Sequence, residues 1–233
     1  MITIYTVAYN EENQLPFLIE FYRLRFPNCE IIVYDNMSTD NTVNIAKTNN
    51  CKIISYDTNN QISDRKYLEI KNNCWKTSTT DWVLVCDVDE LLDINSNDLI
   101  YENAKGSSII KSEGYNMVNM EGDTDLYSIK YGARHIESDK SYLFNKSYIK
   151  EINYQPGCHV CNPVGKICYS EKSYKAYHYN FINEKLTLEK HKIYAGRLSQ
   201  DNLKHGWGSH YLLSEDAVLK AYEQVRKNAI RLI

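Results

Sequence analysis

Short apolar runs alternate with longer amphipathic segments in the first part of the chain. Four runs are rich in β-branched and aromatic residues and predict buried strands; they cover residues 2–8, 31–35, 52–57 and 82–88. The segments between them repeat apolar residues at helical spacing. Continuous apolar strands that alternate with amphipathic helices predict a mostly parallel sheet with helices on both faces, which is an α/β architecture.

Polar residues at the ends of the apolar segments predict where these helices begin. Asn10 is a candidate N-cap for the first helix, and Pro27 ends that helix. Either Ser38 or Asp40 opens the short second helix, and Ser63 precedes the third. Each of these side chains can accept a hydrogen bond from a free backbone N–H of the first turn.

The pattern loosens after residue 95. Tyrosine-rich stretches there predict mixed or antiparallel β-structure that extends the sheet. Residues 214–232 predict a helix, with Ser214 as its cap and an apolar stripe that runs from Val218 to Ile230. Because neither a repeat nor a clear linker interrupts the chain, we expect a single domain over residues 1–233.

Composition excludes some classes of partner and favours an intracellular address. The 233 residues carry a net charge of -3, so a nucleic-acid partner is not expected. No apolar run approaches the ~20 residues that cross a bilayer, and residues 1–10 lack the pattern of a signal peptide. We therefore expect a cytoplasmic protein without a transmembrane segment. The seven cysteines then favour buried free thiols over disulfides.

Acidic and amide side chains follow the predicted strands at the point where each strand ends. Asp87 and Asp89 follow the fourth strand, Asp35 closes the second, and Asn10 and Glu12 follow the first. In an open parallel sheet, ligands bind beyond the carboxyl ends of the strands. Two carboxylates at this spacing suit a hard divalent cation that bridges the protein to a diphosphate. The alternative is a solvated acidic turn.

Three segments, in this order and at these separations, resemble glycosyltransferases of the GT-A fold, near the family 2 type with small cytoplasmic and viral members. They are TVAYNEENQLPFLIEFY, VYDNMSTDNT and DWVLVCDVDELL, and they span roughly the first hundred residues. The resemblance implies a nucleotide-binding half over residues 1–95 and an acceptor-binding half over residues 96–233. The stretch YLFNKSYIKEINYQPGCHV resembles the acceptor side of the small members.

The resemblance also implies roles for individual residues. The nucleotide-binding set comprises Thr6, Ala8, Asn10, Glu12, Asp35, Arg65 and Asp87. Asp89 is implied as a direct ligand of Mn²⁺ or Mg²⁺, with Asp87 at or near the cation. Several of these residues have a structural alternative: Asn10 as a cap, Arg65 as a solvated helix charge and Asp35 as a turn former.

A later histidine is expected to complete the cation site. Related enzymes commonly bring such a residue to the metal or the diphosphate, and His159 is the first choice, as a metal ligand and catalytic residue beside Asp89. His178 is the second. The same region contains Cys158 and Cys161, but a structural zinc site is disfavoured because no second closely spaced pair follows them.

The roles of other residues in the acceptor-binding half are left open by the sequence. The general base of an inverting transfer is unassigned; its candidates are the acidic residues of the MEGDTDLY loop, Glu121, Asp123 and Asp125. The choice between inversion and retention is therefore open too. Trp207 is a candidate acceptor platform. Lys190, His191, Lys192 and Arg197 could close over a diphosphate, although a solvated helix face is the favoured interpretation.

These observations together predict a metal-dependent glycosyltransferase, of the hexosyl- or deoxyhexosyltransferase type. Its donor would be a UDP-, GDP- or dTDP-linked sugar, and its acceptor a hydroxyl on a glycan, a lipid carrier or a glycoprotein. One alternative is a nucleotidyltransferase, which usually has a glycine-rich basic loop where this chain has AYNEE. Another is a non-catalytic sugar-nucleotide-binding or zinc-stabilised interaction protein.

Overall fold

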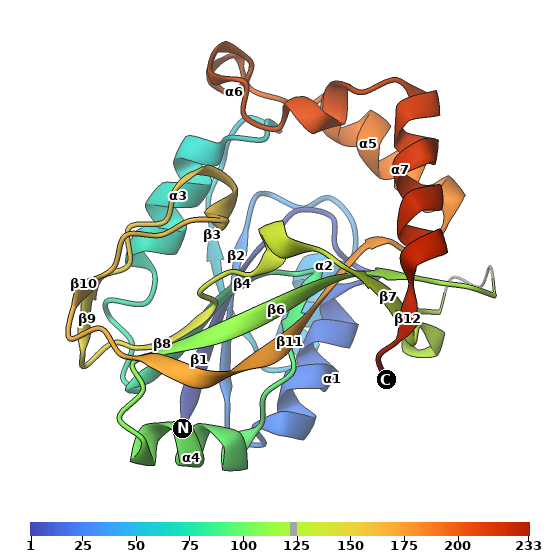
Figure 1. The fold of residues 1–233 in the computed structure, drawn as a ribbon. Helices are drawn as coiled ribbons and strands as arrows, with labels where there is room; N and C mark the ends of the chain where they lie inside the picture. The colour runs from blue at the N-terminus through green and yellow to red at the C-terminus, as the bar shows by residue number, and fades with distance from the viewer. Residues whose placement is uncertain (122–124) are drawn as a thin grey trace.

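A computed structural model describes residues 1–121 and 125–233 of the chain (Figure 1). The first part follows the predicted alternation of strands and helices. Its elements are β1 (Ile2–Ala8), α1 (Leu15–Arg25), β2 (Glu30–Asp35), α2 (Thr42–Thr48), β3 (Lys52–Ser55), α3 (Asp64–Asn73), β4 (Trp82–Asp87) and β5 (Glu90–Leu92). The four predicted strands are confirmed to within two residues at each end.

The second part mixes short strands, helices and one long strand. Its elements up to the long strand are α4 (Ser96–Ala104), β6 (Ile109–Val118), η1 (Leu126–Ser128), β7 (Tyr131–Arg134), η2 (Ile136–Ser138), β8 (Leu143–Asn145), β9 (Ile149–Glu151), η3 (Pro156–Cys158), β10 (Val164–Gly165) and β11 (Tyr169–Phe181). The elements that follow are α5 (Glu184–Ala195), α6 (Gln200–His205), η4 (Ser209–Leu212), α7 (Glu215–Asn228) and β12 (Ile230–Arg231).

One large sheet forms the centre of the molecule. Its main path runs β12-β7-β6-β8-β4-β1-β2-β3, and β5 and β11 join it from the side. The strands of the first part, β4-β1-β2-β3, are all parallel. The added strands are mostly antiparallel, although β11 runs parallel to β6. The predicted mixed extension of a parallel sheet is therefore confirmed.

Apolar side chains of the parallel strands cover both faces of the sheet, as the uninterrupted apolar runs predict. Ile4 of β1 packs in the core that holds α1, whereas Tyr5, the next residue, packs with Trp75, just past the end of α3. Because neighbouring residues of a strand point to opposite faces, each face needs its own cover. The α/β fold class, with helices on both faces, is thus correct.

Helix starts agree with the sequence at some positions and differ at others. The hydroxyls of Ser63 and Ser214 cap α3 and α7 by accepting hydrogen bonds from backbone N–H groups in the first turn. Asn10 is not the cap of α1, which begins at Leu15 after Gln14. Asn10 has a φ of 55° instead, in the left-handed region that asparagine tolerates better than most residues.

The helices α5, α6 and α7 lie together on the side of the sheet where the parallel strands end (Figure 1). A hydrogen bond from Ile62 N to Arg197 O, 2.6 Å long, joins this layer to the segment before α3. Within the described parts of the chain, no helix combines the length and apolar character needed to cross a bilayer. The seven cysteines are free thiols.

Candidate active site

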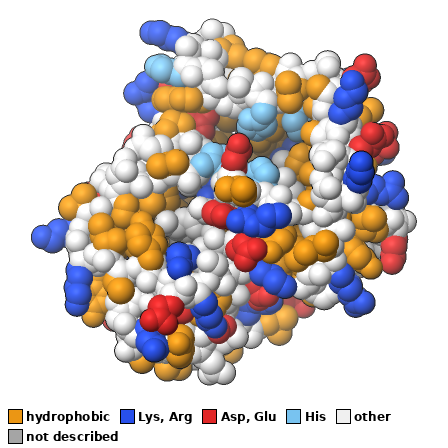
Figure 2. All heavy atoms as spheres, viewed as in Figure 1, with side chains coloured by type: hydrophobic (Ala, Val, Ile, Leu, Met, Phe, Trp, Pro, Cys, Tyr) orange, Lys and Arg blue, Asp and Glu red, His pale blue; other side chains and the backbone are white. Residues whose placement is uncertain are grey.

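A cavity of about 540 Å³ lies between the ends of the parallel strands and the C-terminal helices. Its lining includes residues that follow β1 and β4, the N-terminal turn of α3, the η3 turn, the end of β11, and α5. Figure 2 shows histidine and acidic side chains gathered around a hollow at this place. The volume suits a ligand of nucleotide size, and the position is where α/β sheets bind ligands.

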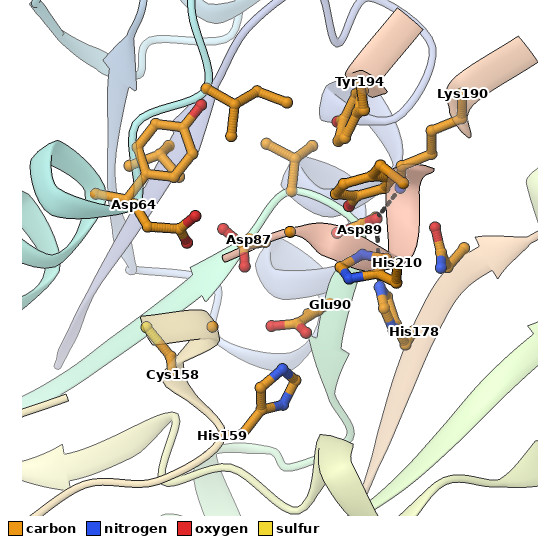
Figure 3. A pocket seen from close by; sticks show the side chains of 18 of the residues that line it. Asp64, Asp87, Asp89, Glu90, Cys158, His159, His178, Lys190, Tyr194 and His210 are labelled. Carbon is orange, nitrogen blue, oxygen red and sulfur yellow. Dashed lines mark hydrogen bonds and ion pairs between the residues drawn. The ribbon is translucent and has the colours of Figure 1, made fainter. Parts of the chain in front are cut away.

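Asp87 and Asp89 lie in the wall of this cavity, at the tight connection between β4 and β5. The buried residue Val88 between them packs into the core, so the two flanking carboxylates turn toward the cavity. Their partners differ. Asp87 Oδ1 accepts a hydrogen bond of 2.6 Å from Lys71 Nζ of α3. Asp89 Oδ2 accepts one of 2.6 Å from Lys190 Nζ of α5 (Figure 3).

The long strand β11 brings His178 to Asp89. Tyr179 N donates a hydrogen bond of 2.8 Å to Asp89 O, and β11 pairs with β5 in antiparallel register. His178 Nε2 consequently lies 3.5 Å from Asp89 Oδ2 (Figure 3). The other ring nitrogen, Nδ1, is buried and has no hydrogen-bond partner among the described residues.

The charge of Asp89 is held in place by its neighbours. Burial by itself would raise the pKa of this carboxyl, but the Lys190 ammonium and His178 outweigh burial and bring the pKa well below its usual value. Burial likewise opposes the charge of Lys190, and Asp89 raises the pKa of Lys190 well above its usual value. The two groups are therefore charged together at neutral pH.

A second pair of charges lies beneath Asp87. Lys140 Nζ donates a hydrogen bond of 2.5 Å to Glu90 Oε1, and both side chains are almost fully buried. Lys71, which is equally buried, holds Asp87. Burial tends to raise the pKa of Asp87, but Lys71 and Lys140 outweigh it and lower that pKa. Two lysines and two carboxylates thus form a compact, charge-balanced floor of the cavity.

The donor atoms around Asp89 fit a divalent cation that is only partly held by protein. A carboxylate oxygen and an imidazole nitrogen 3.5 Å apart can both face one cation. The described residues do not gather three such ligands into one group. Mg²⁺-type sites commonly combine one or two protein ligands with substrate phosphates and water. The set Asp89 and His178 fits this type, with Lys190 Nζ as the positive charge next to it.

Glu11, in the loop after β1, is a further carboxyl of this region. It lines the cavity, and burial together with the nearby charge of Asp89 raises its pKa to about 8, against an offsetting effect of Lys190. A carboxyl with such a pKa is mostly protonated at neutral pH. Sequence reasoning did not single out Glu11, because it stands between Asn10 and Glu12 in a uniformly polar stretch.

Replacing Glu11 by glutamine should make the protein more stable at alkaline pH. The folded-state pKa lies above the ordinary value of 4.5, so ionising Glu11 costs stability progressively from pH 4.5 to about 8. By pH 9 this cost is on the order of 4 kcal/mol. Urea unfolding with a chelator present measures the free energy of unfolding. That of Glu11→Gln should be higher than that of wild type at pH 9 and close to it at pH 5.

The neighbouring exposed residue gives the control for this prediction. Glu12→Gln makes the same change of side chain in the same loop and controls for the loss of a carboxylate there. A Glu11→Gln variant that follows the wild-type profile from pH 5 to pH 9 would show that Glu11 ionises normally in the folded protein.

The structure places the sequence-predicted residues in two groups. Lining the cavity are Ala8, Asp87, Asp89 and His159. The other predicted residues are not among the described residues that line the cavity. They are Thr6, Asn10, Glu12, Asp35 and Arg65. Thr6 is buried in β1, and its hydroxyl has no partner among the described residues.

Three residues of the second group shape the loops beside the cavity. Asn10 Oδ1 accepts a hydrogen bond of 2.8 Å from Thr39 N, and Glu12 Oε2 accepts one of 3.1 Å from Asn41 N. Asp35 is buried and accepts a hydrogen bond from Ser38 N, the turn-forming contact considered as its alternative. These contacts join the loop after β1 to the loop after β2.

Arg65 and His159 also have partners away from Asp89. Arg65 is an exposed residue of α3 whose Nε donates to Asp201 Oδ2 at 2.9 Å. His159 lines the cavity, but its Nδ1 contacts the carbonyl oxygen of Glu137 at 2.6 Å. His178, the second choice, is therefore the histidine that meets Asp89. Strand pairing decides this, because β11 pairs with β5 while the η3 turn does not.

The candidate bases of the MEGDTDLY loop do not enter the cavity where the structure describes them. Glu121 and Asp125 are absent from the described cavity lining, and Asp123 lies outside the described residues. Trp207 does line the cavity. So do Lys71, Lys140 and Lys190, and the favoured sequence interpretation of Lys190 as part of a solvated helix face is wrong.

Comparison with known families gives a match over part of the chain. Residues 3–105 match the model of Glycosyl transferase family 2. These residues include β1 to β5 and α4, and with them Asp87 and Asp89. A comparison with curated proteins finds no match.

Several solved structures are similar to parts of the chain. S. aureus TarS 1-349 is 17% identical with a TM-score of 0.48, and the match covers 84% of this chain and 64% of that one. The same protein in complex with UDP-GlcNAc gives 17% and 0.47, over 84% and 66%. The chain spans less than two thirds of either.

Glucosyl-3-phosphoglycerate synthase from Mycobacterium tuberculosis, in complex with Mn²⁺, UDP and glucosyl-3-phosphoglycerate, is 17% identical with a TM-score of 0.34. That match covers 52% of this chain and 44% of the synthase. Residues 3–105, which contain the parallel strands of the sheet together with Asp87 and Asp89, are therefore the part of the chain that is similar to Glycosyl transferase family 2.

Proposed function

We propose that the protein is a metal-dependent glycosyltransferase. It transfers a sugar from a nucleoside diphosphate sugar to a hydroxyl group on a glycan, a lipid carrier or a glycoprotein. The donor carries UDP, GDP or dTDP, and the cation is Mn²⁺ or Mg²⁺. One observation supports this most strongly: the family match includes Asp87 and Asp89, and both line the cavity at the end of β4.

Asp89 and His178 are the residues that would hold the cation, and Asp87 would face the ribose or the water around the cation. When bound, the cation supplies positive charge that stabilises the departing diphosphate. Lys190 adds a fixed ammonium next to Asp89. Lys190 would donate a hydrogen bond to a phosphate oxygen of the donor when Asp89 holds the cation.

The chain's own contribution to the reaction is mainly positioning and electrostatic stabilisation. In the transfer, an acceptor oxygen forms a bond to the anomeric carbon, and the bond from that carbon to the phosphate oxygen breaks. The acceptor hydroxyl gives its proton to a general base, and the nucleoside diphosphate leaves with the bonding electrons. Lys190 beside Asp89 and the buried Lys71 and Lys140 place positive charge at the cavity, where it would stabilise the departing diphosphate.

A screen of donors tests the proposal. UDP-, GDP- and dTDP-linked sugars are added with Mn²⁺, and both the melting temperature and slow donor hydrolysis are measured. We expect one class of donor to raise the melting temperature by several degrees and to be hydrolysed, since ligands that bind only the folded state stabilise it. A chelator should remove both effects. If no donor stabilises the protein or is hydrolysed, with or without the cation, the proposal fails.

A further inference from the structure

Arg197 stands out among the residues around the cavity because part of its charged group has no partner. The side chain lines the cavity, and Nε donates a hydrogen bond of 3.0 Å to the carbonyl oxygen of Asn60. Nη2 is buried and has no hydrogen-bond partner among the described residues. A buried N–H of a guanidinium without a partner is costly, so this position calls for an acceptor from a ligand.

The guanidinium is also held in a fixed orientation. Its central carbon lies 3.5 Å from the centroid of the Tyr9 ring, which is a close cation–π contact. Tyr9 directly follows β1 and lines the same cavity. Stacking on Tyr9 and the hydrogen bond to Asn60 O together hold the guanidinium in place. They leave Nη2 as the nitrogen that can bind a ligand.

Backbone contacts fix the segment that presents Arg197. Residues 197–202, here called the strap, run past the start of α3. Ser199 N donates a hydrogen bond of 3.0 Å to Ile62 O, and Asp64 N donates one of 3.0 Å to Asn202 Oδ1. The strap is thus docked on the nucleotide-binding half of the fold, although it lies more than a hundred residues away in sequence.

The surroundings of Arg197 differ from those of Lys190. Aromatic and aliphatic side chains line the cavity as well, and two of them contact Arg197: its guanidinium stacks on the Tyr9 ring, and its carbonyl oxygen accepts a hydrogen bond from Ile62 N. Lys190 lies in α5, before Arg197 in the sequence, and is beside Asp89. A flat apolar group suits the first environment and a diphosphate the second.

From this geometry we infer that Arg197 binds the nucleoside end of the donor, with Nη2 donating a hydrogen bond to a carbonyl oxygen of the base. Uracil, thymine and guanine carry such an oxygen. The strap is accordingly part of the donor site, and Arg197 contributes to the affinity for the nucleoside. This inference rests on the proposed function, because it takes a nucleoside diphosphate as the ligand.

The test compares nucleotide binding with binding of a probe that lacks the nucleoside. Calorimetric titrations use UDP, GDP and dTDP with Mn²⁺, and inorganic pyrophosphate with Mn²⁺. Arg197→Gln removes the charged donor while keeping a similar length. We expect it to weaken the best nucleoside diphosphate by about 10- to 100-fold and to leave pyrophosphate unchanged. Arg197→Lys should fall between, because lysine keeps the charge but loses the planar fork.

Lys192→Gln is the matched control, since Lys192 is an exposed residue of α5 outside the described cavity lining. It should bind both probes as wild type does. The inference is overturned if Arg197→Gln binds nucleotides normally, or if it weakens pyrophosphate by the same factor, as a purely structural or phosphate-binding role would. Failure of the wild type to bind any nucleotide would instead reject the proposed function, and the inference with it.

Discussion

Replacing Asp89 by asparagine should lower donor hydrolysis and sugar transfer by at least about 100-fold, the scale of effects seen when a metal site is disturbed. Asparagine has nearly the same shape, but it lacks the charge that Lys190 and His178 face. The cation loses its anionic ligand, and Lys190 keeps a buried charge without a counterion. Single-turnover assays at saturating donor, with and without Mn²⁺, measure the loss.

Asp81→Asn is the control, because it makes the same change beside the same strand. Asp81 immediately precedes β4, so it lies at the opposite end of the strand from the cavity, where its carboxylate accepts a hydrogen bond of 2.7 Å from Ser147. The activity of the Asp81→Asn variant should stay within a few-fold of that of wild type. Circular dichroism verifies that both variants fold. A folded Asp89→Asn protein with full, Mn²⁺-dependent activity would mean that the cation does not bind at Asp89.

Replacing Lys140 by methionine should destabilise the protein by about 3–5 kcal/mol, because it leaves the buried carboxylate of Glu90 without its partner. For a chain of this size that corresponds to a fall of roughly 6–20 °C in the melting temperature. Adding Glu90→Gln should recover much of the loss, since the remaining group is then neutral. Urea unfolding of the two variants and wild type measures the difference.

An exposed ion pair provides the comparison. Lys76 and Glu151 are 2.7 Å apart, with side chains 35% and 44% exposed. Lys76→Met should cost no more than about 1 kcal/mol, as is usual for surface pairs. Equal losses for Lys140→Met and Lys76→Met, or no recovery in the double variant, would argue that Glu90 is solvated rather than buried in the floor of the cavity.

The fold of the first part could be predicted because its information is local. Each strand is a short apolar run, and Ser63 lies directly before the helix that it caps. The same local logic could have found α4, since Asn95 and Asp98 form a reciprocal capping box. The pairing of β11 with both β5 and β6 could not be predicted, because it depends on contacts between distant segments.

The site residues also divide into those that the local sequence predicts and those that depend on contacts between distant segments. Asp87 and Asp89 were predicted from their position after an apolar strand, and both line the cavity. Lys190 was named, but its role at the diphosphate was the less favoured interpretation, because it lies 101 residues from Asp89 in a helix whose charged residues suit a solvated face. His178 was ranked second because only the register of β11 shows that it, and not His159, reaches Asp89.

The most direct test of a cation site at the end of β4 is a crystal soaked with MnCl₂ and UDP. Anomalous scattering measured near the manganese edge locates the ion without assumptions about its ligands. Our account predicts one manganese peak bonded to a carboxylate oxygen of Asp89, with His178 and the diphosphate beside it. Manganese bound elsewhere, or UDP bound while Asp89 stays paired with Lys190 and no manganese peak is present, would contradict it.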